Sequence, residues 1–467
     1  MGIVLSGGRI VTALDDYQAD IRLDGEKISA IGQGIAQPGD EVIDVNGCLL
    51  FPGGIDPHTH FDLPVGNTVT ADDFESGTKA AIMGGTTTII DFATQNHGES
   101  LSLALDNWHA KAKGKCYTDY SFHMAVTDWN EAVAKEMDLL LQEGVSSFKF
   151  YLAYKNTLQV GNDVLLEALD KSKANGSLIL VHAENGDIIQ RRIKDALEEG
   201  HTAPLYHALS RPVIAEREAV TRALALAEAA NAPLYIVHLT SKEALKAVAA
   251  SKIRGQEVYG ETCPQYLLLD NSFYHKEGFE GSKYVMSPPL RTKTDQEHLW
   301  IGLNSGMLDT VATDHCSFNF KGQKELGKDD FSKIPNGIPG VENRMALLYT
   351  YGVLSGRISI NRFVLLTSTR SAQLFGLFPQ KGTIAVGSDG DIVVWDPEAS
   401  SVISAKTQYQ HVDYTPYEGF RLKGVPVHVF LRGRQAVCDK NLIQEPPQGV
   451  YLYRKPLCQR GERICTR

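Results

Sequence analysis

Short apolar segments alternate with longer helical ones from about Phe51 to about Phe375, and this alternation constrains the fold more than any other feature. Eight of the apolar segments have the length and composition of buried β-strands. The eight segments are 48–56, 86–93, 119–126, 146–153, 177–184, 233–240, 257–263 and 308–315. Strands that alternate with helices usually pair in parallel, so eight of them predict a closed (β/α)8 TIM barrel of the α/β class. An open doubly wound sheet is the alternative, but it usually has fewer strands.

The two ends of the chain have a different pattern. From Gly2 to about Leu50, and again after Gly382, short alternating segments are broken by glycine, which is typical of β-strands. Each end is too small for a domain by itself, so we expect both ends to form one β-sandwich domain, with the barrel inserted between them. The predicted boundaries are 1–52 and 377–440 for the two parts of the sandwich, 53–376 for the barrel and 441–467 for a C-terminal tail.

Composition excludes several classes of protein. With 467 residues, of which 43% are hydrophobic and 22% charged, the chain is globular and long enough for two domains. A net charge of −10 argues against a nucleic-acid partner, which would need a basic face. No apolar run approaches the ~20 residues of a transmembrane helix, so we expect no membrane partner. Seven cysteines without paired C-x-x-C spacing favour a reducing, cytoplasmic location.

Polar side chains stand at or near the carboxyl ends of several predicted strands, and in a (β/α)8 barrel that rim carries the active site. The set comprises His58, His60, Lys149, His182, His238 and Asp314. His58 and His60 are two residues apart, so in an extended segment both point the same way and can face one ion. Imidazole nitrogens and carboxylate oxygens suit Zn²⁺ or a similar divalent cation, and the absence of cysteine from the set suits a catalytic rather than a structural site.

Each member of this set also has a simpler explanation. A single His-x-His, or either His182 or His238 alone, is more often a hydrogen-bonded core residue than a metal ligand. A bare ammonium at Lys149 would be costly to bury. That lysine therefore either pairs with a carboxylate or loses its proton and becomes a carbamate that bridges two metal ions. Four histidines and Asp314 in barrel order are difficult to explain by packing, and this favours a metal site.

Longer segments carry a family resemblance. They are DPHTH (56–60), AYKN (153–156), VHAENGD (181–187), VHLTSKEA (237–244), GETCPQYL (260–267), YVMSPPLR (284–291) and the run from Thr313 to Met345. Together they resemble dihydropyrimidinases and D-hydantoinases of the amidohydrolase superfamily. The resemblance covers essentially the whole chain, including both outer β regions, and the run after Thr313 is highly specific. It implies an enzyme that hydrolyses cyclic amides.

The resemblance implies two bound divalent metal ions, most naturally Zn²⁺, with Mn²⁺ as the alternative. The more buried ion would be held by His58, His60 and Asp314. The second ion would be held by His182 and His238. Lys149, carboxylated on its side-chain nitrogen by CO₂, would bridge both ions. Every one of these positions is filled as the family pattern requires.

The resemblance also assigns residues to the substrate. Tyr154 would donate its hydroxyl to the substrate carbonyl, and Ser287 and Asn336 would hold the ring amide. Asp314 would move a proton from the attacking water to the departing ring nitrogen. The reaction would open a 5,6-dihydropyrimidine or a 5-substituted hydantoin to an N-carbamoyl amino acid. The loop residues expected to shape the pocket around the ring substituent are Leu63, Val65, Tyr151 and Leu158.

Two alternatives stay open at this point. Another cyclic amidohydrolase, of the allantoinase or dihydroorotase type, would share the metal ligands but not the AYKN, SPPLR and IPNG segments together. A non-enzymatic scaffold relative would lack the metal ligands, whereas all six are present here. The family further suggests a homotetramer in which the C-terminal tail, from about Val450, packs on a neighbouring subunit.

Overall fold

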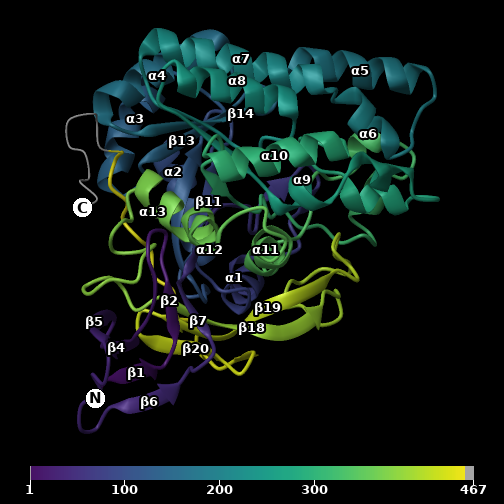
Figure 1. The fold of residues 1–467 in the computed structure, drawn as a ribbon. Coiled ribbons are helices and arrows are strands. Elements are labelled where there is room, and N and C mark those ends of the chain that lie inside the picture. The colour runs from purple at the N-terminus through teal and green to yellow at the C-terminus, as the bar shows by residue number, and fades with distance from the viewer. Residues whose placement is uncertain (1, 458–467) are drawn as a thin grey trace.

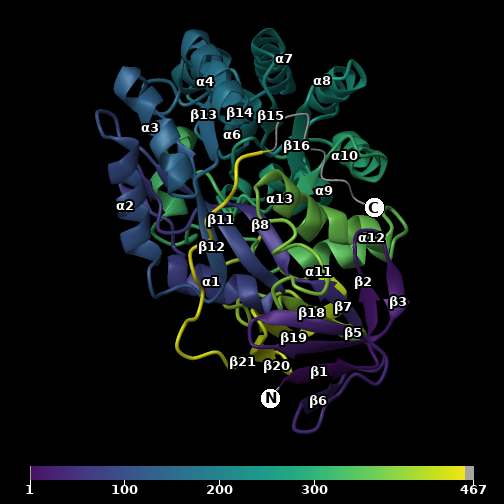
Figure 2. The same cartoon turned by 90° about the vertical axis from the view of Figure 1, so that its left-hand side faces the viewer.

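The computed structural model of the protein describes residues 2–457. At its centre, eight parallel strands follow one another in chain order around a barrel (Figure 2). The strands are β8 (Gly54–Thr59), β11 (Thr86–Thr94), β12 (Asp119–Ala125), β13 (Ser147–Tyr151), β14 (Leu178–His182), β15 (Leu234–Ile236), β16 (Val258–Thr262) and β17 (Thr310–Val311). The first and last strands meet where Thr59 bridges His315, and the His60 N–H donates to the His315 carbonyl at 2.8 Å. The predicted (β/α)8 barrel is therefore confirmed.

Helices form the outer layer of the barrel (Figures 1 and 2). Those between successive strands are α1 (Phe74–Met83), α2 (Leu101–Ala112), α3 (Glu131–Gln142), α4 (Asn162–Asn175), α5 (Gly186–Glu198), α6 (Leu205–Ser210), α7 (Val213–Ala230), α8 (Lys242–Ile253), α9 (Pro264–Leu268) and α10 (Lys293–Ser305). After the last strand come α11 (Arg344–Leu348), α12 (Ile360–Val364) and α13 (Arg370–Leu374). Several helices begin at a side-chain cap, such as Asp73 before α1 and Ser241 before α8, which satisfies amide donors at the helix start.

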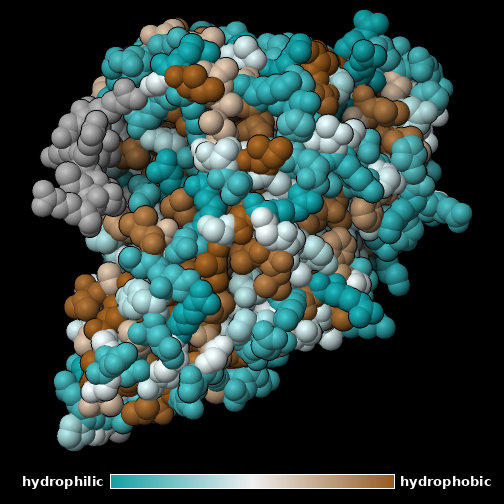
Figure 3. Space-filling model, viewed as in Figure 1, coloured by the Kyte–Doolittle hydropathy of each residue, from teal (hydrophilic) through white to brown (hydrophobic). Residues whose placement is uncertain are grey.

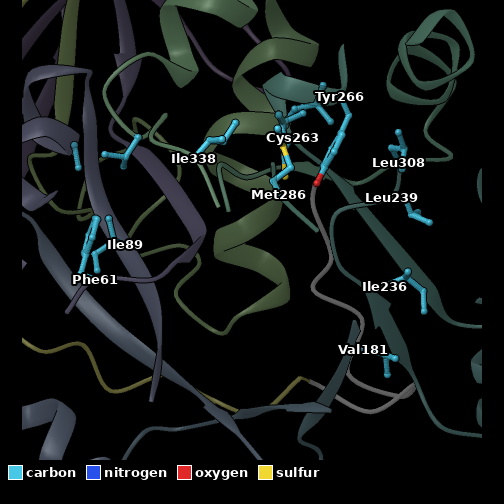
Figure 4. Close-up of a cluster of buried hydrophobic side chains, with 14 of the residues drawn as sticks. Phe61, Ile89, Val181, Ile236, Leu239, Cys263, Tyr266, Met286, Leu308 and Ile338 are labelled. Carbon is cyan, nitrogen blue, oxygen red and sulfur yellow. The ribbon is translucent and has the colours of Figure 1, made fainter. Parts of the chain in front are cut away.

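The barrel strands are buried on both faces, so their sequences are nearly continuous apolar runs rather than alternating apolar and polar residues. In β11, Ile89 belongs to the large cluster that packs against the helices, whereas Ile90 and Phe92 belong to the cluster inside the barrel. Figure 4 shows Ile89 with other members of the large cluster, including Val181 of β14 and Ile236 of β15. Neighbouring strands thus contribute to one continuous layer beneath the helices.

Two further sheets form the second domain, in the lower part of Figure 1. The four-stranded sheet contains β5 (Lys27–Gly32), β4 (Asp20–Asp24), β1 (Ile3–Ser6) and β6 (Glu41–Asp44) in that order. The seven-stranded sheet contains β21 (Asn441–Leu442), β20 (Arg434–Cys438), β19 (Arg421–Leu431), β18 (Ile392–Val402), β7 (Leu49–Pro52), β2 (Arg9–Val11) and β3 (Asp16–Gln18). Because β7 pairs with β18, the two chain ends form one sheet. Their shared core includes Leu5, Leu50 and Val394, so the predicted sandwich from both ends is confirmed.

A buried arginine lies at the seam where the barrel closes. β17 is only two residues long, and the first and last strands are joined by a single bridge rather than by a full ladder. Arg344, at the start of α11, donates to the carbonyl oxygens of Ile55 at 2.8 Å and of Val311 at 2.9 Å. Its guanidinium thus satisfies backbone acceptors on both sides of the seam, where ladder partners are missing.

The first part of the tail, residues 450–454, packs on its own barrel, and packing of the tail on a neighbouring subunit stays a prediction. The Tyr120 N–H donates to the Val450 carbonyl at 3.0 Å, and the Leu452 N–H donates to the Tyr120 carbonyl at 2.8 Å. Arg454 is buried and donates to the hydroxyl oxygens of Ser121 and Ser147, both at 2.9 Å. These contacts fix residues 450–454 alongside β12, while the basic end of the tail, from residue 458, lies outside the described residues.

The surface does not separate into large apolar and polar regions on the face drawn in Figure 3, where hydrophobic and hydrophilic side chains are interspersed. Among the helices within residues 2–457, not one has both the length and the apolar character needed to cross a bilayer.

Candidate active site

The barrel strands position the predicted ligands at one end of the barrel, although two of the strands are much shorter than expected. His58 lies in β8, Lys149 in β13, and His182 is the last residue of β14. Strands were predicted over 233–240 and 308–315, but the structure forms them only over Leu234–Ile236 and Thr310–Val311. His238 and Asp314 therefore lie beyond the strand ends. Their backbones have φ of 40° and 52°, in the left-handed region, and such residues cannot continue a β-ladder.

The first ligand group combines His58, His60 and Asp314. The Nε2 atoms of His58 and His60 lie 3.1 Å and 3.2 Å from the same carboxylate oxygen, Oδ1 of Asp314. One donor atom from each of the three residues therefore lies within 4.8 Å of the others. Two imidazole nitrogens and a carboxylate oxygen at this spacing fit a divalent cation, and the geometry agrees with the His-x-His reasoning from sequence.

The second group joins His182 and His238. Nδ1 of His182 lies 2.9 Å from Nε2 of His238, so the two rings turn a nitrogen toward one point. The ring centroids of His58 and His238 are 5.5 Å apart, which makes the two groups neighbours. Adjacent sets of nitrogen and oxygen donors are suited to a pair of metal ions.

Lys149 lies at the first group and is buried. Its Nζ is 3.0 Å from Nε2 of His58 and 4.1 Å from the centre of the Phe92 ring. Within residues 2–457, the structure gives Lys149 no carboxylate partner inside salt-bridge distance, so the simpler explanation from sequence, an ion pair, is not supported. Burial lowers the pKa of the Lys149 ammonium to about 8, which makes the neutral amine accessible near neutral pH.

Burial also sets the protonation of the other groups. Desolvation lowers the pKa of His60 to about 4 and holds that of His238 well below its usual range, so both imidazoles are neutral, as metal ligands must be. Desolvation opposes ionisation of Asp314, but the adjacent His58 and His60 outweigh it and hold the pKa of this carboxyl well below its usual range. His60 and His238 are therefore neutral and Asp314 is anionic. Burial and Lys149 act to lower the pKa of His58, but Asp314 and Glu261 outweigh them and raise it above its usual value.

Two buried glutamates orient the histidines, and the sequence reasoning missed both. Oε1 of Glu261 lies 2.7 Å from Nδ1 of His58, so the imidazole donates there and its Nε2 stays free. Oε2 of Glu184 lies 2.9 Å from Nε2 of His182, which places the imidazole proton there and leaves Nδ1, the nitrogen that faces His238, unprotonated. A signal was present in the sequence: Glu184 follows His182 by two residues, and Glu261 is a charge inside an apolar strand.

Two buried aspartates fix the backbone that carries the ligands. Asp91 of β11 accepts from the Thr59 hydroxyl at 2.8 Å and from the Phe61 N–H at 2.9 Å, which holds the segment around His60. Asp56 accepts from the Thr313 hydroxyl at 2.6 Å, which ties the residue before Asp314 to β8. These bonds join segments that are far apart in the sequence, and no local pattern revealed them.

Tyr154 lies beside the second group. Its ring centroid is 5.2 Å from that of His182, and the Arg211 guanidinium lies 5.4 Å from the Tyr154 ring centroid. Burial raises the pKa of the phenol to about 12 even though Arg211 opposes the shift, so the hydroxyl keeps its proton at neutral pH and can donate it. The backbone has φ of 66°, which is rare for a bulky residue, and strain of this kind is concentrated at functional sites.

The two expected ring-binding residues lie on joined loops. Ser287 is buried, and Asn336 is half-buried. The Gly337 N–H, next to Asn336, donates to the Val285 carbonyl, two residues before Ser287, at 3.0 Å. The Ser287 hydroxyl lies near the Tyr154 phenol and acts to lower its pKa, so this serine lies at the same end of the barrel as Tyr154. The structure thus brings these segments together, but their role toward a substrate stays a prediction.

The four residues expected to shape the pocket lie on two loops. Tyr151 is buried, with its ring 6.1 Å from that of Tyr154 and 5.1 Å from Nζ of Lys149. Leu158 belongs to the turn after Tyr154, whose carbonyl accepts the Leu158 N–H at 3.0 Å. Leu63 and Val65 are half-buried and lie at the hairpin of β9 (Pro64–Val65) and β10 (Thr68–Val69), just after β8. Of these four residues, Tyr151 lies against the ligand groups, with its ring centroid 5.8 Å from that of His182.

Comparisons with known proteins agree with this geometry. Residues 49–436 match the sequence profile of the amidohydrolase family. The chain is 51% identical to D-hydantoinase of Geobacillus stearothermophilus over 452 residues, which cover 97% of this chain and 96% of the relative. It is 44% identical to D-phenylhydantoinase of Escherichia coli O1:K1 / APEC over 459 residues, with coverage of 98% and 99%.

A solved structure extends the likeness to three dimensions. The crystal structure of dihydropyrimidinase from Brevibacillus agri NCHU1002 matches this fold with a TM-score of 0.97 and 50% sequence identity, covering 98% of this chain and 100% of that one. The family profile spans most of the sequence, and the relatives align over nearly their whole length with the barrel, the β domain and the ligand groups included. This chain therefore belongs to the amidohydrolase family.

Proposed function

We propose that this protein hydrolyses cyclic amides, opening 5-substituted hydantoins and 5,6-dihydropyrimidines to N-carbamoyl amino acids. The observation that carries the proposal is that four histidines, Asp314 and the buried Lys149 converge on one barrel rim. The names of the related proteins, D-hydantoinase, D-phenylhydantoinase and dihydropyrimidinase, support this class of substrate.

The ligand groups would hold two divalent metal ions. His58, His60 and Asp314 would bind one, and His182 and His238 the other, with Zn²⁺ favoured by the nitrogen and oxygen donors and Mn²⁺ as the alternative. Lys149 would bridge both ions as a carbamate, since a neutral amine is the form that reacts with CO₂ and burial lowers its pKa to about 8. When bound, the ions would supply a nucleophilic water near neutral pH and polarise the ring carbonyl.

The chain's own residues would complete the reaction. Tyr154, protonated at neutral pH, would donate its hydroxyl to the carbonyl oxygen as negative charge develops there. Asp314 would accept the proton of the attacking water and pass it to the departing ring nitrogen. The segments of Ser287 and Asn336 would hold the ring amide in the reactive orientation, so that the scissile carbonyl faces the metal ligands.

Substrate preference would depend on the loops after β8 and β13. Leu63, Val65, Tyr151 and Leu158 would contact the ring substituent, and an apolar lining of this kind favours hydrophobic groups. Because one methylene is worth only about 1–3 kcal/mol in such a pocket, the enzyme is expected to accept several substituents. A panel of dihydrouracil, 5-phenylhydantoin, allantoin and dihydroorotate tests the assignment. Hydrolysis of allantoin or dihydroorotate alone would assign the protein to the other cyclic amidohydrolases, and no hydrolysis would favour a scaffold.

The metal bridge is tested by Lys149→Ala. We expect wild type to contain about two divalent ions per chain, and the variant to lose both metal content and activity because the bridging anion is removed. Lys135→Ala, on the exposed surface of α3, is the control and is expected to match wild type. Full metal content with full activity in Lys149→Ala would overturn the bridging role.

A homotetramer is proposed from the family resemblance, and a cytoplasmic location from the seven cysteines without paired C-x-x-C spacing. Light scattering on the purified protein measures the oligomeric state, and fractionation of the source cells measures the location.

A further inference from the structure

Lys324 is a second buried lysine, outside the ligand groups, in the long loop after β17. Its side chain is fully buried, and Nζ donates to three backbone carbonyls: Val285 at 2.8 Å, Pro335 at 2.6 Å and Gly337 at 2.7 Å. Within the described residues, no carboxylate lies within ion-pair distance of this ammonium. All three of its hydrogens are therefore used on main-chain oxygens.

The three carbonyls belong to the two segments that carry the expected ring-binding residues. Val285 is two residues before Ser287, while Pro335 and Gly337 stand on either side of Asn336. One ammonium thus joins both segments, which are otherwise linked at this point by the Gly337 N–H to the Val285 carbonyl. The segments are about 50 residues apart in the chain, so their relative position depends on such cross-links.

Other side chains hold only one of the two segments. Nε2 of His207 lies 2.8 Å from the Met286 carbonyl, and the Tyr266 hydroxyl donates to the Pro288 carbonyl at 2.8 Å. Figure 4 shows Met286, Tyr266 and Ile338 within the same buried cluster. The Ser287 segment is therefore fixed on both sides. The Lys324 side chain joins it to the Asn336 segment, alongside the main-chain bond from Gly337 to Val285.

Packing alone does not account for a lysine here. A buried ammonium without a counter-ion is costly, and a methionine would fill the same volume without that cost. Desolvation lowers the pKa of Lys324 to about 7, and the one titratable group that acts on it, the Cys316 thiol, opposes the shift. The protonated form can donate to all three carbonyls at once, whereas the neutral amine can donate to only two.

We propose that Lys324 is a positioning residue for cyclic-amide binding: its ammonium holds the Ser287 and Asn336 segments at the spacing that the ring amide requires. The inference rests on the proposed function, because it takes those two segments as the ring-binding ones. It assigns Lys324 no contact with the metal ligands.

The test compares Lys324→Met with Lys324→Gln, and uses Lys328→Met, an exposed lysine of the same loop, as the matched control. kcat, KM, metal content and melting temperature are measured on 5-phenylhydantoin and dihydrouracil. We expect Lys324→Met to raise KM by about tenfold or more, because the segments lose their cross-link, while metal content stays at the wild-type value. Lys324→Gln, which keeps two donors, should fall between wild type and Lys324→Met, and Lys328→Met should leave all values unchanged.

A purely structural role predicts a different result. It would lower the melting temperature and the fraction of folded enzyme, so apparent kcat would fall while KM stayed at the wild-type value, and that result would overturn the proposal. If Lys324→Met does not fold, the same comparison of KM and kcat in Lys324→Gln decides between the positioning role and the purely structural role. A wild-type enzyme inactive on every cyclic amide would instead refute the proposed function itself.

Discussion

The role of Glu261 leads to a quantitative prediction about metal affinity. This buried carboxylate accepts three hydrogen bonds, from Nδ1 of His58 at 2.7 Å, the Tyr235 hydroxyl at 2.8 Å and the His238 N–H at 3.0 Å. In Glu261→Gln the amide NH₂ must face one of these donors, and the bond to His58 loses its charge. With an uncharged and therefore weaker acceptor opposite Nδ1, His58 more readily places its proton on Nε2, the atom needed for the metal.

The size of the effect follows from the bond that is lost. A hydrogen bond to a charged group contributes about 1.5–3 kcal/mol, which corresponds to about 10- to 150-fold in affinity. We expect Glu261→Gln to bind Zn²⁺ more weakly by this factor. The assay titrates metal-free protein with Zn²⁺ against a coloured chelator of known affinity, so it does not depend on activity.

The control for this experiment is Tyr235→Phe, which removes another bond to the same carboxylate but leaves the His58 contact intact. It should reduce Zn²⁺ affinity much less than Glu261→Gln does. Zn²⁺ affinity within twofold of wild type in a folded Glu261→Gln protein would refute the reasoning that this carboxylate sets the His58 tautomer.

Two further predictions concern stability. Replacing the fully buried Arg344 with Met should lower the free energy of unfolding by about 3–5 kcal/mol, because backbone carbonyls on both sides of the barrel seam and the nearby Asp56 lose their partner. Chemical denaturation measures this loss. The control is Arg357→Met, in a surface pair with Glu297, which should cost less than about 1 kcal/mol; equal losses in the two variants would contradict the argument. Burial lowers the pKa of His207 to about 3, below the value of this imidazole in the unfolded chain. The neutral imidazole therefore contributes to the stability of the folded state above pH 6.5, and this contribution is lost as the pH falls toward 3. His207→Phe should therefore lose stability less steeply than wild type on acidification between those pH values, and parallel curves would show that His207 does not titrate in this way.

Much of the architecture could be predicted because it depends on local patterns of apolar and polar residues. The apolar strand segments and the helices between them identified the barrel, and the β-like ends identified the second domain. His58 and His60 were recognisable because strand geometry places residues i and i+2 on one side. The substrate contacts came from the family resemblance. The carbamate on Lys149 was one of two explanations that the residues left open, and the resemblance favoured it. Both stay proposals.

What the sequence did not reveal depends on contacts between distant segments. The strands before His238 and Asp314 end early because both residues take left-handed backbone conformations, and neither is a glycine that would have signalled this. Glu261 binds ring and main-chain atoms of His58 and His238, which are 203 and 23 residues away, and Lys324 binds the Val285 carbonyl, 39 residues away. These partners depend on the closed barrel and on the path of the loop after β17 rather than on sequence spacing. The path of residues 450–454 along β12 is equally non-local.

The pairing of β7 with β18 has a consequence for biosynthesis. Strand β7 ends at Pro52 and β18 begins at Ile392, so about 340 residues are translated between them. At about 5–20 residues per second, the N-terminal segment waits on the order of 20–70 s before its partner emerges from the ribosome. During that interval the edge of β7 that later pairs with β18 lacks its partner, and an unpaired apolar strand edge is a site at which nascent chains can aggregate.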